Sequence, residues 1–393
     1  MATTLTTSMA RGENDRTVGR EAARTALADL NTDPILAVVF SAPAYDYEAV
    51  LAGVRETVPG AALLGASTAG EFAGASVSED GVVVALLASD EMRVFTGLGR
   101  NVSEDPEAAV AEAAATLPEE YAEPHAVGIN VHDGVAGLGE ELAMLGYQHY
   151  PVPFVGGSAA DGLALEETHV FVDDEVASDA VGLALLVSEK PFGLAVEHGH
   201  EPIAGPIEAT ATEGGTIQEL DGRPAFDVYR EAIREPAREH YGIDVDDLAE
   251  EELQQLLTFF EFGVRTGEDD YKVRWPGLTP DESGPLSFPG TIPEGTELFV
   301  MHSPKAAQIE SAREAGRTAV ESLDGQRPSG ALVFDCACRG AILGEEFDQA
   351  VAAIDEAIDA PLAGFETYGE VNLQPGEMRG FHNTTSSILL FPA

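Results

Sequence analysis

The sequence predicts an α/β protein with two related halves, built from β-α-β-α-β units with mixed sheets, and with antiparallel strands at the centre of the chain. Short continuous apolar runs, such as residues 35–40, are typical of strands buried on both faces, and they alternate with segments at helical spacing. A glycine-containing motif recurs along the chain, which indicates internal repetition. Runs that alternate apolar and polar residues with period two mark the central region.

The chain opens with a polar, Thr-rich segment, which predicts a flexible N-terminus over residues 1–17. An Ala-, Leu- and Arg-rich helix follows, and then an apolar strand that begins after Pro34. A second segment at helical spacing stops at a Pro-Gly pair, after which a strand resumes. The predicted helix, strand, helix and strand cover residues 18–30, 35–40, 45–57 and 61–65.

One motif links distant parts of the chain. The sequence L-L-G-A-S-T-A-G-E at residues 63–71 recurs as L-A-G-F-E-T-Y-G-E at 362–370, so that G-x-x-T-x-G-E is kept. A weaker copy, F-V-G-G-S-A-A-D, occupies residues 154–161. The segments before the second and third copies match as well: strands are expected at 92–96 and 297–302, then at 126–131 and 331–336, with helices between them. We therefore expect residues 92–161 to superpose on 297–369.

Between these halves the pattern changes to period two. Antiparallel strands are expected over residues 169–173, 180–188 and 193–199. Pro202, Gly205 and Pro206 are expected to interrupt any regular element. The sequence therefore predicts an N-terminal domain over residues 18–201 and a C-terminal domain over 202–393.

The charge balance excludes a general nucleic-acid binder. The 393 residues hold 69 Asp and Glu against 21 Lys and Arg, a net charge of −48, and such a surface repels phosphate and anionic lipid. Only Lys190, Lys272 and Lys305 are lysines. This composition resembles that of proteins from salt-loving archaea, in which molar salt screens surface charge over about 3 Å. We expect a halophilic protein from an acidic proteome.

The cysteine pattern and the absence of apolar segments indicate a cytoplasmic location. Cys336 and Cys338 lie two residues apart and cannot join distant elements, which argues against a secreted disulfide framework. No signal peptide is apparent, and no uncharged apolar run reaches about 18 residues, the length of a membrane span. We expect no membrane partner.

Familiar catalytic and nucleotide motifs are missing from the sequence. It contains no G-x-x-x-x-G-K-[ST] phosphate loop, no G-x-S-x-G nucleophile turn and no H-E-x-x-H pair. His198 and His200 are two potential metal ligands without a third, and the alternative is a solvated turn. We expect no cofactor and no metal.

The first candidate site is F-D-C-A-C-R-G at residues 334–340, at the end of a predicted strand where a helix should start. Arg339 and backbone donors there would favour an anionic ligand group, with Asp335 and Cys336 beside them. Cys336 and Cys338 have two open interpretations. They are buried small hydrophobes, or Cys336 is a thiol activated by its surroundings.

The second candidate site joins T-Y-G-E at residues 367–370 to F-H-N-T-T at 381–385. Hydroxyl, carboxylate, imidazole and amide groups at strand ends can form hydrogen bonds with a small polar molecule. Arg339 would hold a ligand carboxylate on an exposed rim and Glu370 an amino group. The alternative is a turn in which Glu370 is a cap or exposed. The predicted ligand-binding residues are Asp335, Cys336, Arg339, Thr367, Tyr368, Glu370, His382 and Asn383.

Taken in order, these motifs resemble those of the FIST sensory domain. The N-terminal part carries L-L-G-x-S-T-A-G-E and V-G-G-S-A-A-D, and the C-terminal part carries A-F-D-V-Y, F-D-C-x-C-R-G, G-F-x-T-Y-G-E and F-H-N-T-T. The resemblance covers residues 18–393, with 18–201 as FIST N and 202–393 as FIST C. It implies a ligand-binding input module, often fused to kinases or chemotaxis receptors, with small molecules such as amino acids as ligands. Since the resemblance leaves no stretch of adequate length, we expect no output domain within residues 1–393.

Three functions follow as hypotheses. The first is a cytoplasmic sensory module that binds a small polar molecule, an amino acid or organic acid, and signals to a separate partner protein. The second is an enzyme with Cys336 as nucleophile and His382 as base, although no complete catalytic constellation is apparent in the sequence, which disfavours catalysis. The third is a scaffold that binds a partner protein through the central antiparallel strands.

Overall fold

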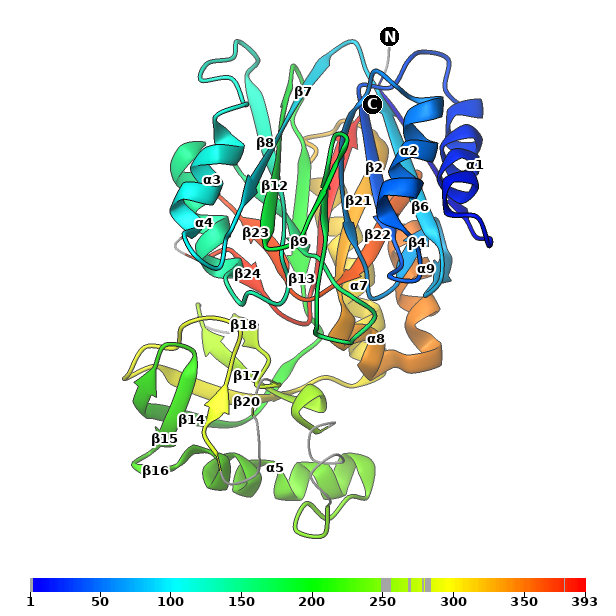
Figure 1. The fold of residues 1–393 in the computed structure, drawn as a ribbon. Coiled ribbons are helices and arrows are strands. Elements are labelled where there is room, and N and C mark those ends of the chain that lie inside the picture. Colours follow the sequence, from blue (N-terminus) through cyan, green and yellow to red (C-terminus); the bar gives the residue numbers. More distant parts are fainter. Residues whose placement is uncertain (1–2, 249–255, 268–269, 278, 280–283, 378) are drawn as a thin grey trace.

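The computed structural model describes residues 3–248, 256–267, 270–277, 279, 284–377 and 379–393. Figure 1 shows a larger body of sheets and helices above a smaller body that contains α5 (Ala225–Tyr241), with both ends of the chain on the far side of the larger body. Each sheet of the larger body mixes parallel and antiparallel pairs, and the sheet of the smaller body is antiparallel. The predicted α/β class with mixed sheets is therefore confirmed.

Three six-stranded sheets of the larger body share one strand plan, with a single parallel pair at the third and fourth positions. The first sheet has the order β1 (Thr4–Ala10), β6 (Val82–Ala88), β2 (Leu36–Ser41), β3 (Ala62–Ser67), β10 (Val170–Val172) and β11 (Glu175–Ala177). The second has β7 (Met92–Arg100), β12 (Ala180–Ser188), β8 (His125–His132), β9 (Phe154–Ser158), β23 (Glu370–Leu373) and β24 (Phe381–His382). The third has β13 (Gly193–Glu197), β25 (Ser386–Pro392), β21 (Pro328–Cys336), β22 (Leu362–Thr367), β4 (Glu71–Ala73) and β5 (Ser76–Ser78).

The last two strands of every sheet are a hairpin from a different part of the chain. The β4-β5 hairpin follows β3 in sequence but pairs with β22, and β10-β11 follows β9 but pairs with β3. The β23-β24 hairpin follows β22 and pairs with β9. The three repeating units thus exchange hairpins in a closed cycle, which ties sheets from both halves of the sequence together.

The repeat is therefore threefold, and the predicted superposition of residues 92–161 on 297–369 needs correction. The edge strands equivalent to β7 are β1 and β13, whereas β20 (Glu297–His302) belongs to the sheet of the smaller body. The smaller body, residues 201–302, is inserted between β13 and the helix that follows. The sequence pattern of a strand before an Ala-rich helix is the same in both places, but it does not determine which sheet the strand joins.

One apolar core joins the three sheets. Phe40 of the first sheet packs against Phe365 and Phe334 of the third, with ring centroids 4.5 and 6.4 Å apart, and Val155 of the second sheet belongs to the same buried cluster. Burial of this large apolar surface from all three sheets stabilises their common packing. No described helix is long and apolar enough to cross a membrane.

The helices cover the outer faces of these sheets: α1 (Asp15–Ala28) and α2 (Tyr47–Thr57) on the first, α3 (Pro106–Ala114) and α4 (Gly139–His149) on the second, and α7 (Lys305–Glu321), α8 (Ala337–Leu343) and α9 (Phe347–Ile358) on the third. Asn14 and Asp46 cap the first two helices by accepting the N–H groups of Thr17 and Ala49. Because Gly19 lacks a Cβ, which would lie 2.2 Å from the carbonyl oxygen of Val50, these two helices cross closely. The 3₁₀ turn η1 (Gly344–Glu346) lies between α8 and α9 in the chain.

The smaller body packs one sheet against α5 (Ala225–Tyr241). Its strands have the order β16 (Arg223–Pro224), β15 (Thr216–Leu220), β14 (Glu201–Glu213), β20, β17 (Phe260–Arg265) and β18 (Tyr271–Arg274), and β19 (Leu286–Ser287) pairs with β15. The expected interruption near residues 201–206 is wrong, because β14 continues through Pro202 and Pro206. Register shifts after Pro202 and after Ala204 place these prolines at irregular positions of the ladder.

The predicted flexible N-terminus also differs from the structure. Residues 4–10 form β1, which pairs with β6 over its whole length, and α1 begins at Asp15. Leu5 is 1% exposed and belongs to the common core. The Thr-rich composition that suggested a loose segment equally suits a strand, since threonine is β-branched.

Candidate functional site

The repeated G-x-x-T-x-G-E motif forms a turn that fixes each exchanged hairpin. In the first copy, the Thr68 hydroxyl donates to Glu71 over 2.8 Å, and the Gly81 N–H donates to the same carboxylate over 2.6 Å. In the third copy, Thr367 and Thr385 donate to Glu370 in the same way. Burial raises the pKa of Glu370 to about 8. These bonds support the turn alternative for Glu370 over the role of an amino-group anchor.

The second copy ends in Asp161, which shapes a loop over residues 162–167. Its carboxylate accepts the N–H groups of Leu165, Glu166 and Glu167 at 2.7–3.0 Å, and the hydroxyl of Tyr368 also donates to it. Burial alone would raise the pKa of Asp161, but these hydrogen bonds outweigh it and lower the pKa. The loop holds Leu163 and Leu165 at φ values of 71° and 56°, and both side chains are exposed.

A cavity of about 350 Å³ lies where this loop, α8 and the smaller body meet. Apolar groups line most of it, including Val135, Leu163 and Leu165, with Trp275 and Pro289 from the smaller body. None of its described lining residues carries a charge. Its volume falls within the range typical of small-molecule sites.

Four of the eight predicted site residues line this cavity. Cys336 ends β21 and Thr367 ends β22, and the two are paired in register at the edge of the third sheet. Tyr368 follows directly, with its hydroxyl bonded to Asp161, and Asn383 approaches from the segment before β25. The structure therefore brings Cys336, Thr367, Tyr368 and Asn383 together from separate segments, and their role in ligand binding stays a prediction.

Arg339 and Asp335 do not line the cavity. They form an ion pair at 2.8 Å, and both side chains are fully buried. The Arg339 guanidinium also donates to the Ser311 hydroxyl over 3.2 Å and to the Gln308 carbonyl over 3.0 Å on α7. The prediction of an exposed rim cation is wrong, because the first turn of α8 directs Arg339 toward α7 and away from the cavity.

Glu370 and His382 also lie outside the cavity lining. His382 Nε2 is 3.1 Å from the Asn372 carbonyl oxygen, and burial lowers the pKa of His382 well below its ordinary value. Burial raises the pKa of Cys336 well above its ordinary value, so its thiol stays protonated. Among the described residues no hydrogen bond joins His382 to Cys336, so the nucleophile and base pair has no geometric support.

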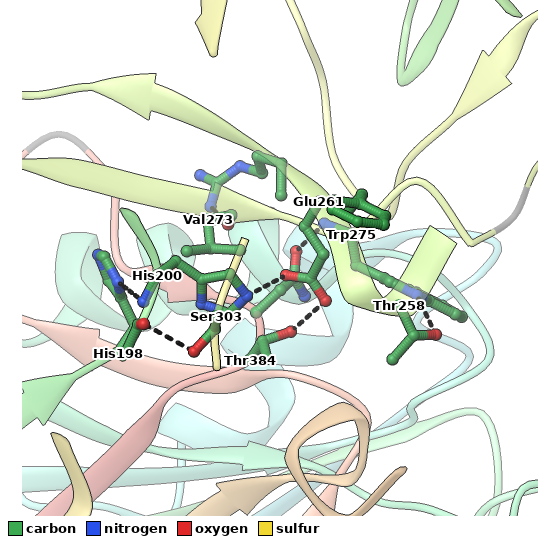
Figure 2. A network of polar contacts seen from close by, with 12 residues as sticks. His198, His200, Thr258, Glu261, Val273, Trp275, Ser303 and Thr384 are labelled. Carbon is green, nitrogen blue, oxygen red and sulfur yellow. Dashed lines mark hydrogen bonds and ion pairs between the residues drawn. The ribbon is translucent and has the colours of Figure 1, made fainter. Parts of the chain in front are cut away.

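Sequence reasoning missed Trp275, the single tryptophan of the chain. Figure 2 shows Trp275 beside Thr258, whose hydroxyl oxygen lies 3.4 Å from the indole nitrogen. The backbone N–H of Trp275 donates to Asn383 Oδ1 over 3.4 Å, a contact between residues 108 positions apart. The only signal in the sequence was the rarity of tryptophan in this chain.

A buried polar network next to this cavity joins the two bodies. Thr384 donates to Glu261 of β17 over 2.6 Å, and His200 Nε2 lies 3.6 Å from the second Glu261 oxygen (Figure 2). Burial raises the pKa of Glu261 well above its ordinary value and lowers that of His200 well below. His198, the other member of the predicted histidine pair, bonds through Nε2 to the Tyr271 carbonyl. No group of three or more potential metal ligands occurs in the described part of the chain.

Two family models match this chain: the FIST N domain over residues 35–223 and the FIST C domain over 225–372. The chain belongs to the FIST family. FIST domains are sensory domains for small ligands in signal transduction. The two models meet near residue 224. The predicted boundary at residues 201 and 202 stays a prediction.

One curated relative is an uncharacterized protein of Methanocaldococcus jannaschii, 26% identical over 198 residues. The match covers 47% of this chain and 38% of that protein, so this chain spans well under half of the relative's length. Two solved structures were also matched: T. maritima PurL complexed with AMPPCP, with a TM-score of 0.23 and 11% identity, and phosphoribosylformylglycinamidine synthase II from Thermotoga maritima, with 0.21 and 10%. Both matches cover 99% of this chain, and they cover 72% and 71% of those chains. Scores this low carry no argument about the fold.

Proposed function

We propose that this FIST protein binds a small molecule in the cavity of about 350 Å³ between its two bodies and signals to a separate protein. The observation that carries the proposal is the mixed lining of this cavity, with Trp275 on the smaller body and Cys336 and Thr367 on the larger. A ligand that contacts both bodies favours one arrangement of them over others. Binding therefore shifts the equilibrium between these arrangements, and the size of the shift is set by the difference in the ligand's affinity for them.

The lining restricts the chemistry of this ligand. Asn383, Thr367 and Tyr368 offer amide and hydroxyl groups, and the remaining wall is mostly apolar. The expectation that the ligand is an amino acid or an organic acid depended on Arg339, which would hold the ligand's carboxylate. Arg339 is paired with Asp335 instead. With no charged group in the described lining, the cavity favours a molecule whose polar groups are uncharged, since an unpaired buried charge is costly.

The two other hypotheses have less support. Cysteine catalysis needs a base near Cys336, and the geometry of His382 does not supply one. The scaffold hypothesis needs accessible central strands, and β12 is buried along its whole length and paired on both edges, which leaves the partly buried edge strand β13 as its support. We place the protein in the cytoplasm because its two cysteines are free, as expected in a reducing compartment.

Trp275 provides a direct test of the ligand site, since it is the single tryptophan and it lines the cavity. We expect a screen of neutral and acidic small molecules to yield neutral ligands that shift its fluorescence in a saturable way. Ala341→Leu places a larger side chain in the cavity wall and should weaken such binding at least about tenfold, or about 1.4 kcal/mol.

The matched control is Ala28→Leu, the same change at an exposed position of α1, and it should leave the affinity unchanged. Equal affinity in the wild type and Ala341→Leu would show that the ligand binds elsewhere. A screen in which only carboxylates bind would contradict the assigned ligand class.

A further inference from the structure

A second cavity, of about 510 Å³, lies on the other side of the loop that contains Leu163. It shares Leu163, Ala337 and Ala341 with the first cavity, but its character is different. Its polar lining consists of the carboxylates Glu79, Glu345, Asp348 and Glu366, and no basic residue occurs in its described lining. Glu79, Glu345 and Asp348 are exposed, whereas Glu366 is 9% exposed.

Glu366 is the unusual member of this set. Among the described residues, none donates a hydrogen bond to its carboxylate or forms an ion pair with it. Two glycines flank it closely: a Cβ on Gly340 would lie 2.0 Å from Oε2, and a Cβ on Gly70 would lie 2.3 Å from Oε1. The carboxylate therefore occupies a slot that side chains at either glycine would fill.

The buried carboxylates around Glu366 all have partners. Asp335 pairs with Arg339, and Glu71 accepts hydrogen bonds from Thr68 and Gly81. The equivalent of Glu366 in the first copy of the motif is Ser67, whose hydroxyl accepts the His169 N–H over 2.9 Å. Burial, together with the charges of Asp335, Glu79 and Glu71, raises the pKa of Glu366 to about 8. An ionised Glu366 thus lacks a counter-charge, and a bound cation would supply one.

We propose that this second cavity binds an aliphatic amine as an organic cation, with one ammonium group paired to Glu366 and the rim carboxylates Glu79 and Asp348 attracting it. An organic cation suits the site better than a metal ion for two reasons. The cavity is far larger than an ion requires, and no group of three potential metal ligands exists in the described part of the chain. Phe347 and Val77 in the same wall offer apolar contact to methylene groups.

The test is isothermal titration calorimetry with 1,4-diaminobutane and 1,5-diaminopentane on the full chain, with butane-1,4-diol as the uncharged analogue. The potassium chloride concentration is the lowest at which the circular dichroism spectrum stays native. We expect both diamines to bind and the diol not to bind. Glu366→Gln keeps the shape of the side chain but removes its charge, and it should weaken diamine binding at least about tenfold.

Two further variants separate the local role of Glu366 from the general negative charge. Glu321→Gln removes an exposed carboxylate of α7 outside this cavity and should leave the affinity unchanged. Asp348→Asn, at the exposed rim, should have an intermediate effect of about two- to fivefold. Three outcomes would each overturn the proposal. They are an equal loss of diamine affinity in Glu366→Gln and Glu321→Gln, no binding of either diamine, and Glu366-dependent binding of calcium in place of the diamines. Fluorescence of Trp275 with a ligand of the first cavity should be the same in Glu366→Gln, so the two sites are tested independently.

Discussion

Arg339→Met should destabilise the fold strongly. The substitution keeps an unbranched side chain in a fully buried position but removes the partner of Asp335. It also removes the donors to Ser311 and Gln308 of α7. Breaking a buried ion pair by removing one partner costs about 3–5 kcal/mol, because the remaining charge is left uncompensated. We expect a loss in the free energy of unfolding within that range.

The measurement is urea unfolding at a fixed molar potassium chloride concentration, followed by circular dichroism and by Trp275 fluorescence. Asp335→Asn and the double variant complete a double-mutant cycle, and we expect a coupling energy of about 2–3 kcal/mol between the two positions. A loss below about 1 kcal/mol in Arg339→Met would be typical of an exposed pair and would refute this reasoning. Unchanged stability together with lost ligand binding would restore the exposed ligand anchor predicted from the sequence.

Two further predictions concern pH and salt. Burial raises the pKa of Glu71 to about 7 and those of Glu366 and Glu370 to about 8, above the ordinary 4.5, so the folded chain binds more protons than the unfolded chain up to those values. The urea midpoint should therefore fall as the pH rises from about 7.5 to 8.5, where histidines with the ordinary pKa of 6.5 are mostly neutral in the unfolded chain, and a flat profile would contradict this. The melting temperature should rise between about 0.1 M and 3 M potassium chloride, because salt screens the net charge of −48, and a temperature indifferent to salt would refute a halophilic adaptation.

Local patterns in the sequence predicted the elements well. The apolar run at residues 35–40 became β2, and helical spacing over 45–57 became α2, because burial and periodicity are local consequences of the sequence. The convergence of Cys336 and Thr367 was also predictable, since neighbouring parallel strands end at the same sheet edge. Long-range choices were not predictable in this way. Nothing near Trp275 indicates that it contacts Asn383, 108 residues away.

The same limit explains the error over Arg339. The spacing of Asp335 and Arg339, at the end of a strand and the first turn of a helix, is compatible with an exposed guanidinium and with a buried pair. The outcome depends on α7, which supplies Gln308 and Ser311 as acceptors. That helix lies about 30 residues earlier in the chain, and its packing against α8 is not apparent from either segment alone.

Hairpin exchange accounts for the presence of two different cavities in a repeated fold. Each exchanged hairpin brings a motif turn of one unit against a strand of another: the Ser158 N–H donates to the backbone carbonyl oxygen of Gly369 over 2.8 Å, and the Ala69 N–H donates to the backbone carbonyl oxygen of Glu366 over 3.1 Å. The first junction borders the uncharged cavity and the second borders the acidic one. At the third junction, where the turn of the second copy meets β3, the Ala160 N–H donates to the carbonyl oxygen of Ser67, the equivalent of Glu366, over 2.9 Å, so serine and glutamate occupy the same backbone position in two sheets. The repeat therefore supplies one scaffold, and substitutions at equivalent positions give its junctions different side chains, a serine hydroxyl at one and a buried carboxylate at another.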